Sequence, residues 1–331
     1  MNFNIVSPLT LTIAVALVFA FINGFHDSGN IVATIISSRA LLPRHALMLI
    51  AIAEFTGPFV FGMAVARTMG RDLVSIQLMT VPALCASITG AIVWNLITWW
   101  FGLPSSSSHA LIGGLLGGAW AVGGVNAIHP HGLIKVLVAL FLSPFLGAIV
   151  GWIIMRITVF LARGARPSIN TFFKQIQVIT AFGLGMSHGS NDSQKSIGLI
   201  TLALLLDHKI STFHVPLWVI AAGAAAIGLG SFFSSQRIIR TLGHKFYKIR
   251  PVHGFTTQTA SSIVIAGAAL LGGPVSTTQV LSSSIIGAGA AQRLSMVRWS
   301  VVMDVIWSWV LTIPAAAAMA YLFYHLLMAV C

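Results

Sequence analysis

Two aspartates lie in short polar runs of an otherwise apolar chain. Asp27 belongs to the run GFHDSGN at 24–30, and Asp192 belongs to the run GMSHGSNDSQKS at 185–196. A carboxylate inside an apolar membrane segment is costly, so such residues usually bind an ion, a proton or a partner side chain. With amide oxygens and glycine-loosened backbone beside them, they suit a sodium or proton site in unwound helix. The residues that would hold a sodium ion are Asp27, Asn30, Asn191 and Asp192.

The two runs differ at one position that matters for cation chemistry. Lys195 follows Asp192 by three residues, at the place that Asn30 has in the first run. Its ammonium could occupy the place of a cation, or its side chain could extend towards a membrane interface. His26 and His188 could join a proton relay, although a membrane histidine is about as often a hydrogen-bonding partner of another helix. The candidates for cation or proton coupling are His26, Asp27, Asn30, Asn191, Asp192 and Lys195.

Each acidic run is followed by a second polar break, PSSSSH at 104–109 and PVSTTQ at 274–279. A proline cannot extend the preceding helix, and the hydroxyl residues after it can cap a new helix that begins there. The free N–H groups of such a helix start, its dipole and the hydroxyls would together bind a tetrahedral oxyanion. Hydroxyls that only hold membrane helices together are the simpler alternative. The candidate anion ligands are Ser105, Ser106, Ser107, Ser276, Thr277 and Thr278.

The order of these motifs indicates an internal repeat. The second break begins 77 residues after the aspartate in the first half and 82 residues after it in the second. Pro144 and Pro314 extend the match, because each follows the proline of its break by 40 residues. Polar interruptions at corresponding positions of two halves are typical of secondary transporters. Two further carboxylates, Glu54 and Asp304, lie in apolar segments and are candidates for coupling, gating or structural hydrogen bonds.

The composition leaves little room for a water-soluble fold, because 57% of the residues are hydrophobic, 7% are charged and the mean hydropathy is +0.93. We predict an all-α polytopic membrane protein with a single transport domain of two inverted repeats, 1–162 and 175–331, joined by a short cytoplasmic connector at 163–174. Each repeat would hold a broken motif helix, further spanning helices and a re-entrant helical hairpin. The N-terminal apolar stretch lacks a basic leader and runs into the first motif, so we expect a retained helix. The expected apolar segments are 8–24, 46–66, 80–101, 133–161, 215–232 and 297–325.

The net charge of +12 does not indicate a nucleic-acid-binding protein, because the basic residues lie in short loops beside apolar segments. Such loops should be cytoplasmic. This is possible if 80–123 and 255–290 are re-entrant hairpins, since each half then crosses the membrane three times and the second half is inverted. Both termini would be extracytoplasmic, and the hairpins would open to opposite sides, as alternating access requires. The basic clusters lie at 39–44, 163–174, 237–250 and 293–298.

Four segments resemble the inorganic phosphate transporter (PiT) family over almost the whole chain. They are NGFHDSGNIVAT at 23–34, WNLITWWFGLPSSSSHALIG at 94–113, GMSHGSNDSQKSIGLI at 185–200 and GGPVSTTQVLSSS at 272–284. The resemblance implies a multi-pass protein of the bacterial inner membrane that imports phosphate by cation symport, as a homodimer and without a cofactor. It places the anion at the six hydroxyl residues above and the coupling cation at Asp27, Asn30, Asn191 and Asp192.

Three positions depart from the sodium-coupled members of that family. His26 and Lys195 stand where asparagine is expected, and Gln279 stands where many members have histidine. The sequence FHD in the first run is more similar to the bacterial low-affinity proton-coupled branch, whose substrate can be a neutral metal–phosphate complex. We therefore expect proton coupling, because an ammonium tethered beside the carboxylates disfavours a bound metal ion by repulsion.

A sodium-coupled phosphate symporter and a sulfate permease are alternatives with the same fold. Phosphate is favoured over sulfate because its O–H can donate to a buried carboxylate, whereas sulfate has no O–H at neutral pH. A channel would differ from a carrier by not accumulating its substrate. An intramembrane serine hydrolase with His109 as base belongs to another class, but the serine run lacks a GxSxG-type turn and Gln279 replaces the histidine in the second half. We therefore expect no enzymatic activity.

Overall fold

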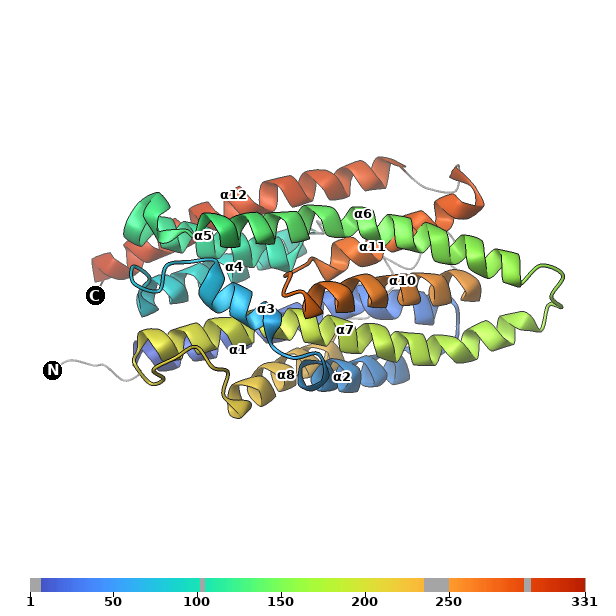
Figure 1. Cartoon of the computed structure of the whole chain (residues 1–331), viewed down its shortest axis with the longest axis horizontal. Helices are drawn as coiled ribbons and strands as arrows, with labels where there is room; N and C mark the ends of the chain where they lie inside the picture. Colours follow the sequence, from blue (N-terminus) through green and yellow to red (C-terminus); the bar gives the residue numbers. More distant parts are fainter. Residues whose placement is uncertain (1–6, 102–104, 235–249, 295–298, 331) are drawn as a thin grey trace.

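The computed structural model describes residues 7–101, 105–234, 250–294 and 299–330 (Figure 1). Across these ranges the protein is helical and has no β-strand, as the composition predicts. The helices are α1 (Pro8–Ser37), α2 (Pro43–Val60), α3 (Ala64–Arg67), α4 (Val81–Trp100), α5 (Ser107–Gly123), α6 (Pro130–Leu161), α7 (Ile169–Leu206), α8 (Leu217–Phe232), α10 (Pro251–Leu270), α11 (Thr277–Gln292) and α12 (Trp299–Val330), with the short helices η1 (Thr68–Asp72) and η2 (Gly124–Ala127). Among these described helices, five are long and apolar enough to cross a membrane, or six if α2 and the helical segment 64–72, which are bent relative to each other, form one span.

The hydroxyl-rich breaks start new helices, as predicted. The Ser106 hydroxyl caps α5 by accepting the N–H of His109 at 3.2 Å. The Ser276 hydroxyl caps α11 by accepting the N–H of Gln279 at 3.4 Å. A cap of this kind satisfies one of the free N–H groups at a helix start. The pairs α4–α5 and α10–α11 are thus helical hairpins at the predicted positions, 80–123 and 255–290.

The helices of the second half repeat those of the first in order. Each half has a long motif helix (α1 or α7), a second helix (α2 or α8), a hairpin (α4–α5 or α10–α11) and another long helix (α6 or α12). In Figure 1, α7 runs in the opposite direction to α1, α12 runs opposite to α6, and the two hairpins approach the middle from opposite ends. This antiparallel order is the one expected for an inverted repeat.

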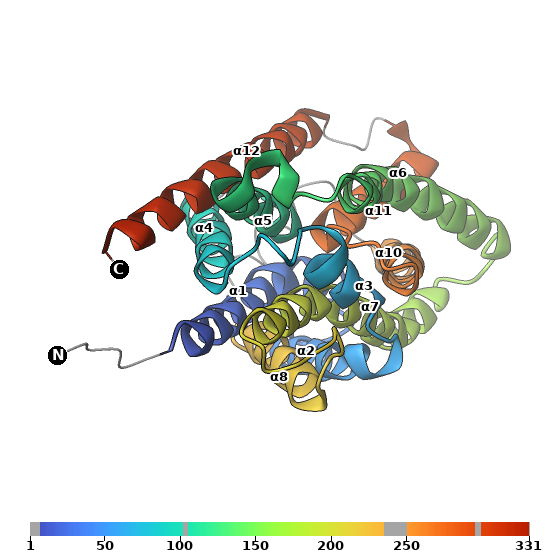
Figure 2. The ribbon, with the colours of Figure 1, turned by 60° about the vertical axis from the view of Figure 1, so that its left-hand side comes forward.

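The two halves pack against each other along the whole bundle. The last helix of each half covers the hairpin of the other, since α6 packs on α10 and α11 while α12 packs on α4 and α5 (Figure 2). Each motif helix also packs against the second helix of the other half, α1 against α8 and α7 against α2. At the α2–α7 contact, a Cβ on Gly189 would lie 2.2 Å from the carbonyl oxygen of Glu54. This close approach brings Glu54 beside the polar middle of α7.

Two predictions about helix continuity are wrong. The motif helices are not broken, because α1 and α7 continue as α-helix through both acidic runs. The carboxylates there find side-chain partners on other helices, so they do not depend on an unwound backbone. Segment 46–66 is not one helix, since α2 ends at Val60 and the helical segment 64–72 is turned by 73° from it. Pro58 inside α2 and Gly62, with a φ of 76°, mark this bend.

Two of the basic clusters lie at the same end of the bundle. The start of α1 and the end of α12 lie at one end, and the α1–α2 and α6–α7 connections lie at the other (Figure 1). These connections carry the basic clusters at 39–44 and 163–166, and α7 begins at Ile169, inside the connector expected at 163–174. Residues 237–249 and 298 of the other two clusters lie outside the described residues. A cytoplasmic location of the basic end stays a prediction.

Candidate functional site

Asp27 on α1 accepts hydrogen bonds from both hairpins. The Ser107 hydroxyl at the start of α5 donates to one carboxylate oxygen at 3.0 Å, and the Thr278 hydroxyl at the start of α11 donates to the other at 2.9 Å. Asn30, about one helical turn after Asp27, donates from its amide to the Thr278 oxygen at 3.4 Å. Asp27 is only 5% exposed. Its carboxylate is therefore satisfied by neutral donors that come from different halves of the chain.

Asp192 on α7 has a different set of partners. The Thr277 hydroxyl donates to one carboxylate oxygen at 3.0 Å, and Nε2 of His188 lies 3.1 Å from the same oxygen. The ammonium of Lys195 donates to the other oxygen. Asp192 is completely buried. The cost of burying this charge is offset by a cationic partner and a hydroxyl donor.

The side chain of Lys195 points into the protein and is 1% exposed. Its Nζ donates to the Ser108 hydroxyl at 2.6 Å and to the Val275 carbonyl oxygen at 2.8 Å, in addition to Asp192. The interpretation that Lys195 extends towards a membrane interface is therefore wrong. The ammonium instead lies where a cation beside Asp192 would lie.

The polar contacts of the two halves correspond in position. Within each half, the first residue of the second hairpin helix, Ser107 or Thr277, donates to the aspartate of that half. Between the halves, the residue three positions after each aspartate contacts the second residue of a hairpin helix of the other half. Asn30 contacts Thr278, and Lys195 contacts Ser108. Only the last contact differs in charge, because one half supplies a neutral amide and the other an ammonium.

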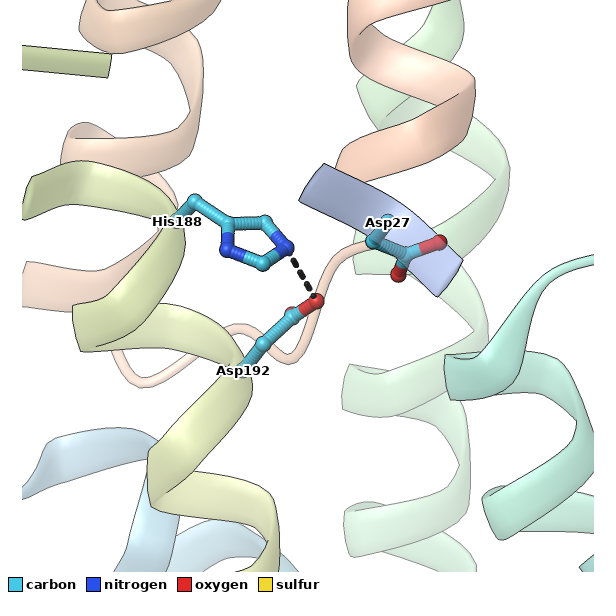
Figure 3. Close-up of side chains that lie close together, drawn as sticks. All are labelled: Asp27, His188 and Asp192. Carbon is cyan, nitrogen blue, oxygen red and sulfur yellow. Dashed lines mark ion pairs between the residues drawn. The ribbon is translucent and has the colours of Figure 1, made fainter. Parts of the chain in front are cut away.

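His188 links Asp192 to a third buried carboxylate, Glu54. Figure 3 shows the His188 ring and Asp192 extending from α7, with Asp27 on the neighbouring α1. Nδ1 of His188 lies 2.9 Å from Glu54 on α2, which also accepts a hydrogen bond from the Ser231 hydroxyl on α8. The ligand atoms of Asp27, His188 and Asp192 lie within 4.8 Å of one another, a spacing that could hold a cation.

His188 was predicted as a possible member of a proton relay but not as one of the coupling residues. A stronger signal was present, because His188 lies four residues before Asp192 and two such residues share one face of a helix. The partner on α2 could not be read from this spacing. Glu54 was named as a candidate, and the structure places it in contact with His188.

Two of the predicted coupling residues lie beside this centre. Asn191 donates to the Gly273 carbonyl at 3.0 Å and accepts the N–H of Val275 at 3.3 Å, so it holds the tip of the α10–α11 hairpin. His26 packs against Trp99, with ring centroids 5.9 Å apart. Among the described residues, no hydrogen bond joins the His26 ring to the two aspartates.

Three of the predicted anion ligands serve the hairpins themselves. The Ser105 hydroxyl lies 2.5 Å from that of Thr98, while Ser106 and Ser276 cap α5 and α11. Ser108 was not among the candidates, because only the tertiary structure brings its hydroxyl into contact with Lys195. The side chain of Asp304, the other gating candidate, lies outside the described part of the chain.

A small cavity lies at the polar centre between α1, α7, α10 and α11. Its volume is about 10 Å³, taken as the room for the centre of a water-sized sphere. That is about the space that one water molecule requires. A tetrahedral oxyanion therefore fits only if the hairpin tips move apart. The lining residues are Asp27, Asn30, Ile31, Leu184, His188, Ile265, Thr277, Thr278 and Leu281.

A known protein family matches both halves of the chain. The family model described as "Phosphate transporter family" matches the chain at residues 23–169 and 161–320. The chain belongs to the phosphate transporter family. Each matched segment of this phosphate transporter family member contains one acidic run and one hydroxyl-rich break. The two halves that the motifs indicated are thus both within the family match.

Several named proteins are similar to this family member over nearly its whole length. Proteins of Rhizobium meliloti (strain 1021) and Bacillus subtilis (strain 168), each named a probable low-affinity inorganic phosphate transporter, are 40% identical to it, with 98% of both chains covered. A protein of the same name from Mycobacterium tuberculosis (strain ATCC 25618 / H37Rv) is 38% identical and covers 96% of this chain and 77% of its own. A solved structure described as the sodium-dependent phosphate transporter superposes with a TM-score of 0.89 at 22% identity, covering 98% of this chain and 100% of its own. At that identity the likeness shows the fold alone.

Proposed function

We propose that this protein is a secondary active transporter that imports inorganic phosphate together with a cation across the bacterial inner membrane. One observation carries the proposal: hydroxyls from the tips of both hairpins donate to Asp27, and a hydroxyl of the second tip donates to Asp192. Two hairpins that close over one centre from opposite ends are suited to alternating access. The two repeats, 1–162 and 175–331 with the connector 163–174, would act as one transport domain.

Phosphate would enter between the hairpin tips and replace the contacts that now close the centre. The hydroxyls of Ser107, Thr277 and Thr278 would turn from the carboxylates to phosphate oxygens, and a phosphate O–H would donate to an aspartate. The starts of α5 and α11 would add N–H groups and the positive ends of two helix dipoles. Ser105, Ser106 and Ser276 would hold the hairpin tips in the shape that this binding requires.

The same centre argues against two alternatives. Sulfate has no O–H at neutral pH, so it would leave a carboxylate facing an oxyanion without a shared proton. A serine hydrolase would need an activated pair, and His109 does lie 2.9 Å from the Ser106 hydroxyl. However, the other nitrogen of His109 faces Gln279 at 3.4 Å instead of a carboxylate, and the Ser106 oxygen already caps α5. Transport is the function that the site supports best.

The buried charges explain why a cation or proton should accompany the anion. The described buried carboxylates are Asp27, Glu54 and Asp192 and the buried ammonium is Lys195, which leaves a formal charge of −2 while His188 is neutral. Adding an anion to this centre is unfavourable unless positive charge enters with it. We propose protons, taken up at Asp27 and along the chain Asp192–His188–Glu54, because both ring nitrogens of His188 lie within reach of a carboxylate. Sodium held between the aspartates is the alternative.

The remaining parts of the proposal rest on the family resemblance. The substrate would be free phosphate or its neutral complex with a divalent metal ion. The functional assembly would be a homodimer surrounded by membrane lipid. Neither part changes the role proposed for the polar centre.

Uptake of radiolabelled phosphate by proteoliposomes tests the proposal. A pH gradient, acid outside, and an inward sodium gradient are imposed separately on vesicles that contain the purified protein. We expect saturable accumulation driven by the pH gradient. Accumulation driven by sodium at uniform pH, with no response to external acid, would contradict proton coupling. Accumulation of labelled sulfate in place of phosphate would contradict the substrate, and no uptake above protein-free vesicles would contradict transport.

A further inference from the structure

The ammonium of Lys195 is held by a set of oxygen atoms that resembles the ligands of a bound metal cation. They are a carboxylate oxygen of Asp192, the hydroxyl of Ser108 and the backbone carbonyl of Val275. Hard cations in proteins are bound by these same three kinds of oxygen. An ammonium has three N–H donors, so all three of them are used here.

The corresponding place in the first half is different. Asn30 lies there, and its amide contacts Thr278 without adding charge. The free space at the polar centre is lined by Asp27, Asn30 and Thr278, and neither Lys195 nor Ser108 borders it. The lysine side chain thus fills the place beside Asp192, while a small cavity remains beside Asp27, between α1 and the helices α7, α10 and α11.

We propose that Lys195 is a built-in cation that takes the place of one exchangeable ion at Asp192. A covalently held charge cannot be released on either side of the membrane, so it takes the place of a metal ion at Asp192 in every state. A metal ion can then exchange only on the Asp27 side, while protons can still bind along Asp192–His188–Glu54. Shortening Lys195 would then open a site for a sodium ion among Asp192, Ser108 and Val275. The effect on coupling rests on the proposed transport function, whereas the opened cation site does not.

Three variants separate this role from simple packing. Lys195→Asn removes the ammonium and makes the second half match Asn30 of the first. Lys195→Met keeps an unbranched chain of similar length but offers no charge and fills the space that an ion would need. Lys195→Asn combined with Ser108→Ala removes one ligand of the opened site.

The first measurement is the melting temperature of detergent-purified protein in sodium chloride and in choline chloride, without phosphate. We expect sodium to raise the melting temperature of Lys195→Asn by a few degrees, because an ion that binds only the folded state stabilises it. The wild type and Lys195→Met should melt at the same temperature in both salts, and the double variant should lose the sodium effect. Equal melting of Lys195→Asn in both salts, or an equal sodium effect in Lys195→Met, would overturn the proposal.

If Lys195→Asn yields folded protein only when sodium is present, that result supports the proposal. If it fails in both salts, the same comparison is made with Lys195→Gln, and an absence of sodium stabilisation there overturns it.

The second measurement is phosphate uptake in proteoliposomes with sodium or choline outside at uniform pH. We expect Lys195→Asn to be at least about tenfold more active with sodium than with choline, since the loss of hydrogen bonds to a charged group has about this effect. The wild type should not distinguish the two salts. Uptake by Lys195→Asn at the wild-type rate in choline would contradict the built-in cation. If no protein takes up phosphate, only the proposed transport function fails, because the melting experiment still reports cation binding.

Discussion

The Thr278 hydroxyl donates a hydrogen bond of 2.9 Å to the Asp27 carboxylate, although 251 positions separate the two residues. Thr278 is the second residue of α11 and Asp27 lies in α1, so this contact joins the two halves at their polar centre. It also explains why a carboxylate can lie inside an intact helix. The donors come from another element, and the backbone of α1 keeps its own hydrogen bonds.

The carboxylates should be required for transport and not for insertion. We expect Asp27→Asn and Asp192→Asn each to abolish concentrative phosphate uptake, because an amide can neither take up the proton nor supply the negative charge that balances a coupling cation. Insertion of Asp27→Asn should be unaffected, since the change removes a buried charge. Asp192→Asn leaves the buried Lys195 ammonium without its carboxylate, so this change is also made together with Lys195→Met. Uptake at matched surface amounts is the measurement, and Asp207→Asn, with a side chain 39% exposed, is the control. Wild-type accumulation by either variant would assign that aspartate a structural role.

The hairpin hydroxyls should determine phosphate affinity. Replacing Ser107 with alanine, or Thr277 and Thr278 together with alanine, should weaken binding, with about 1.5–3 kcal/mol for each lost hydrogen bond to a charged group. Titration of purified protein with phosphate measures this. Ser262→Ala is a matched control, because that hydroxyl donates at 2.7 Å to a carbonyl of its own helix. Unchanged affinity in both hairpin variants would remove these hydroxyls from the binding site.

Glu54 should control the response to pH. Glu54→Gln replaces the carboxylate beside Nδ1 of His188 with a neutral amide, so His188 loses a partner that favours its protonated form. We expect phosphate uptake driven by a pH gradient to fall strongly and the dependence of the initial rate on external pH to become flatter. The rate is compared with that of Asp207→Asn from pH 5 to 8. A pH profile identical to that of the wild type would exclude Glu54 from the proton path.

The α6–α7 and α7–α8 connections should lie on opposite sides of the membrane, because α7 runs the length of the bundle between them (Figure 1). In a protein with Cys85 and Cys331 replaced by serine, a cysteine at Arg166 should react with a membrane-impermeant maleimide only from the cytoplasm. A cysteine at Lys209, whose side chain is 62% exposed, should react only from outside. Labelling of both from the same side would contradict the crossing order.

The contact between α2 and α7 should tolerate no side chain at Gly189. A Cβ there would lie 2.2 Å from the carbonyl oxygen of Glu54, so Gly189→Ala forces the two helices apart. We expect a loss of about 1–3 kcal/mol of stability, as for other overpacked interiors. Gly267→Ala is the control, because no atom lies within 4 Å of a Cβ built there. Equal melting temperatures for the two variants would show that the α2–α7 contact adapts.

Much of the fold could be predicted because its determinants are local. The apolar segments follow from hydropathy. The second helix of each hairpin begins at Ser107 or Thr277, directly after a serine that caps it and that follows a proline in the sequence. The repeat is visible because both halves keep the same motif order. Asp27 and Asp192 were identifiable as a site because a buried carboxylate needs a partner wherever it lies.

The tertiary structure decided which partner each of these residues has. The direction of the Lys195 side chain depends on Ser108 and on a carbonyl of the second hairpin, which reach it only when the halves pack. The continuity of α1 was predicted wrongly for the same reason, because the sequence does not show that hydroxyls from other helices will satisfy Asp27. Hydropathy and capping act over a few residues along the chain, whereas the pairing of buried polar groups depends on the packing of helices that are far apart in sequence.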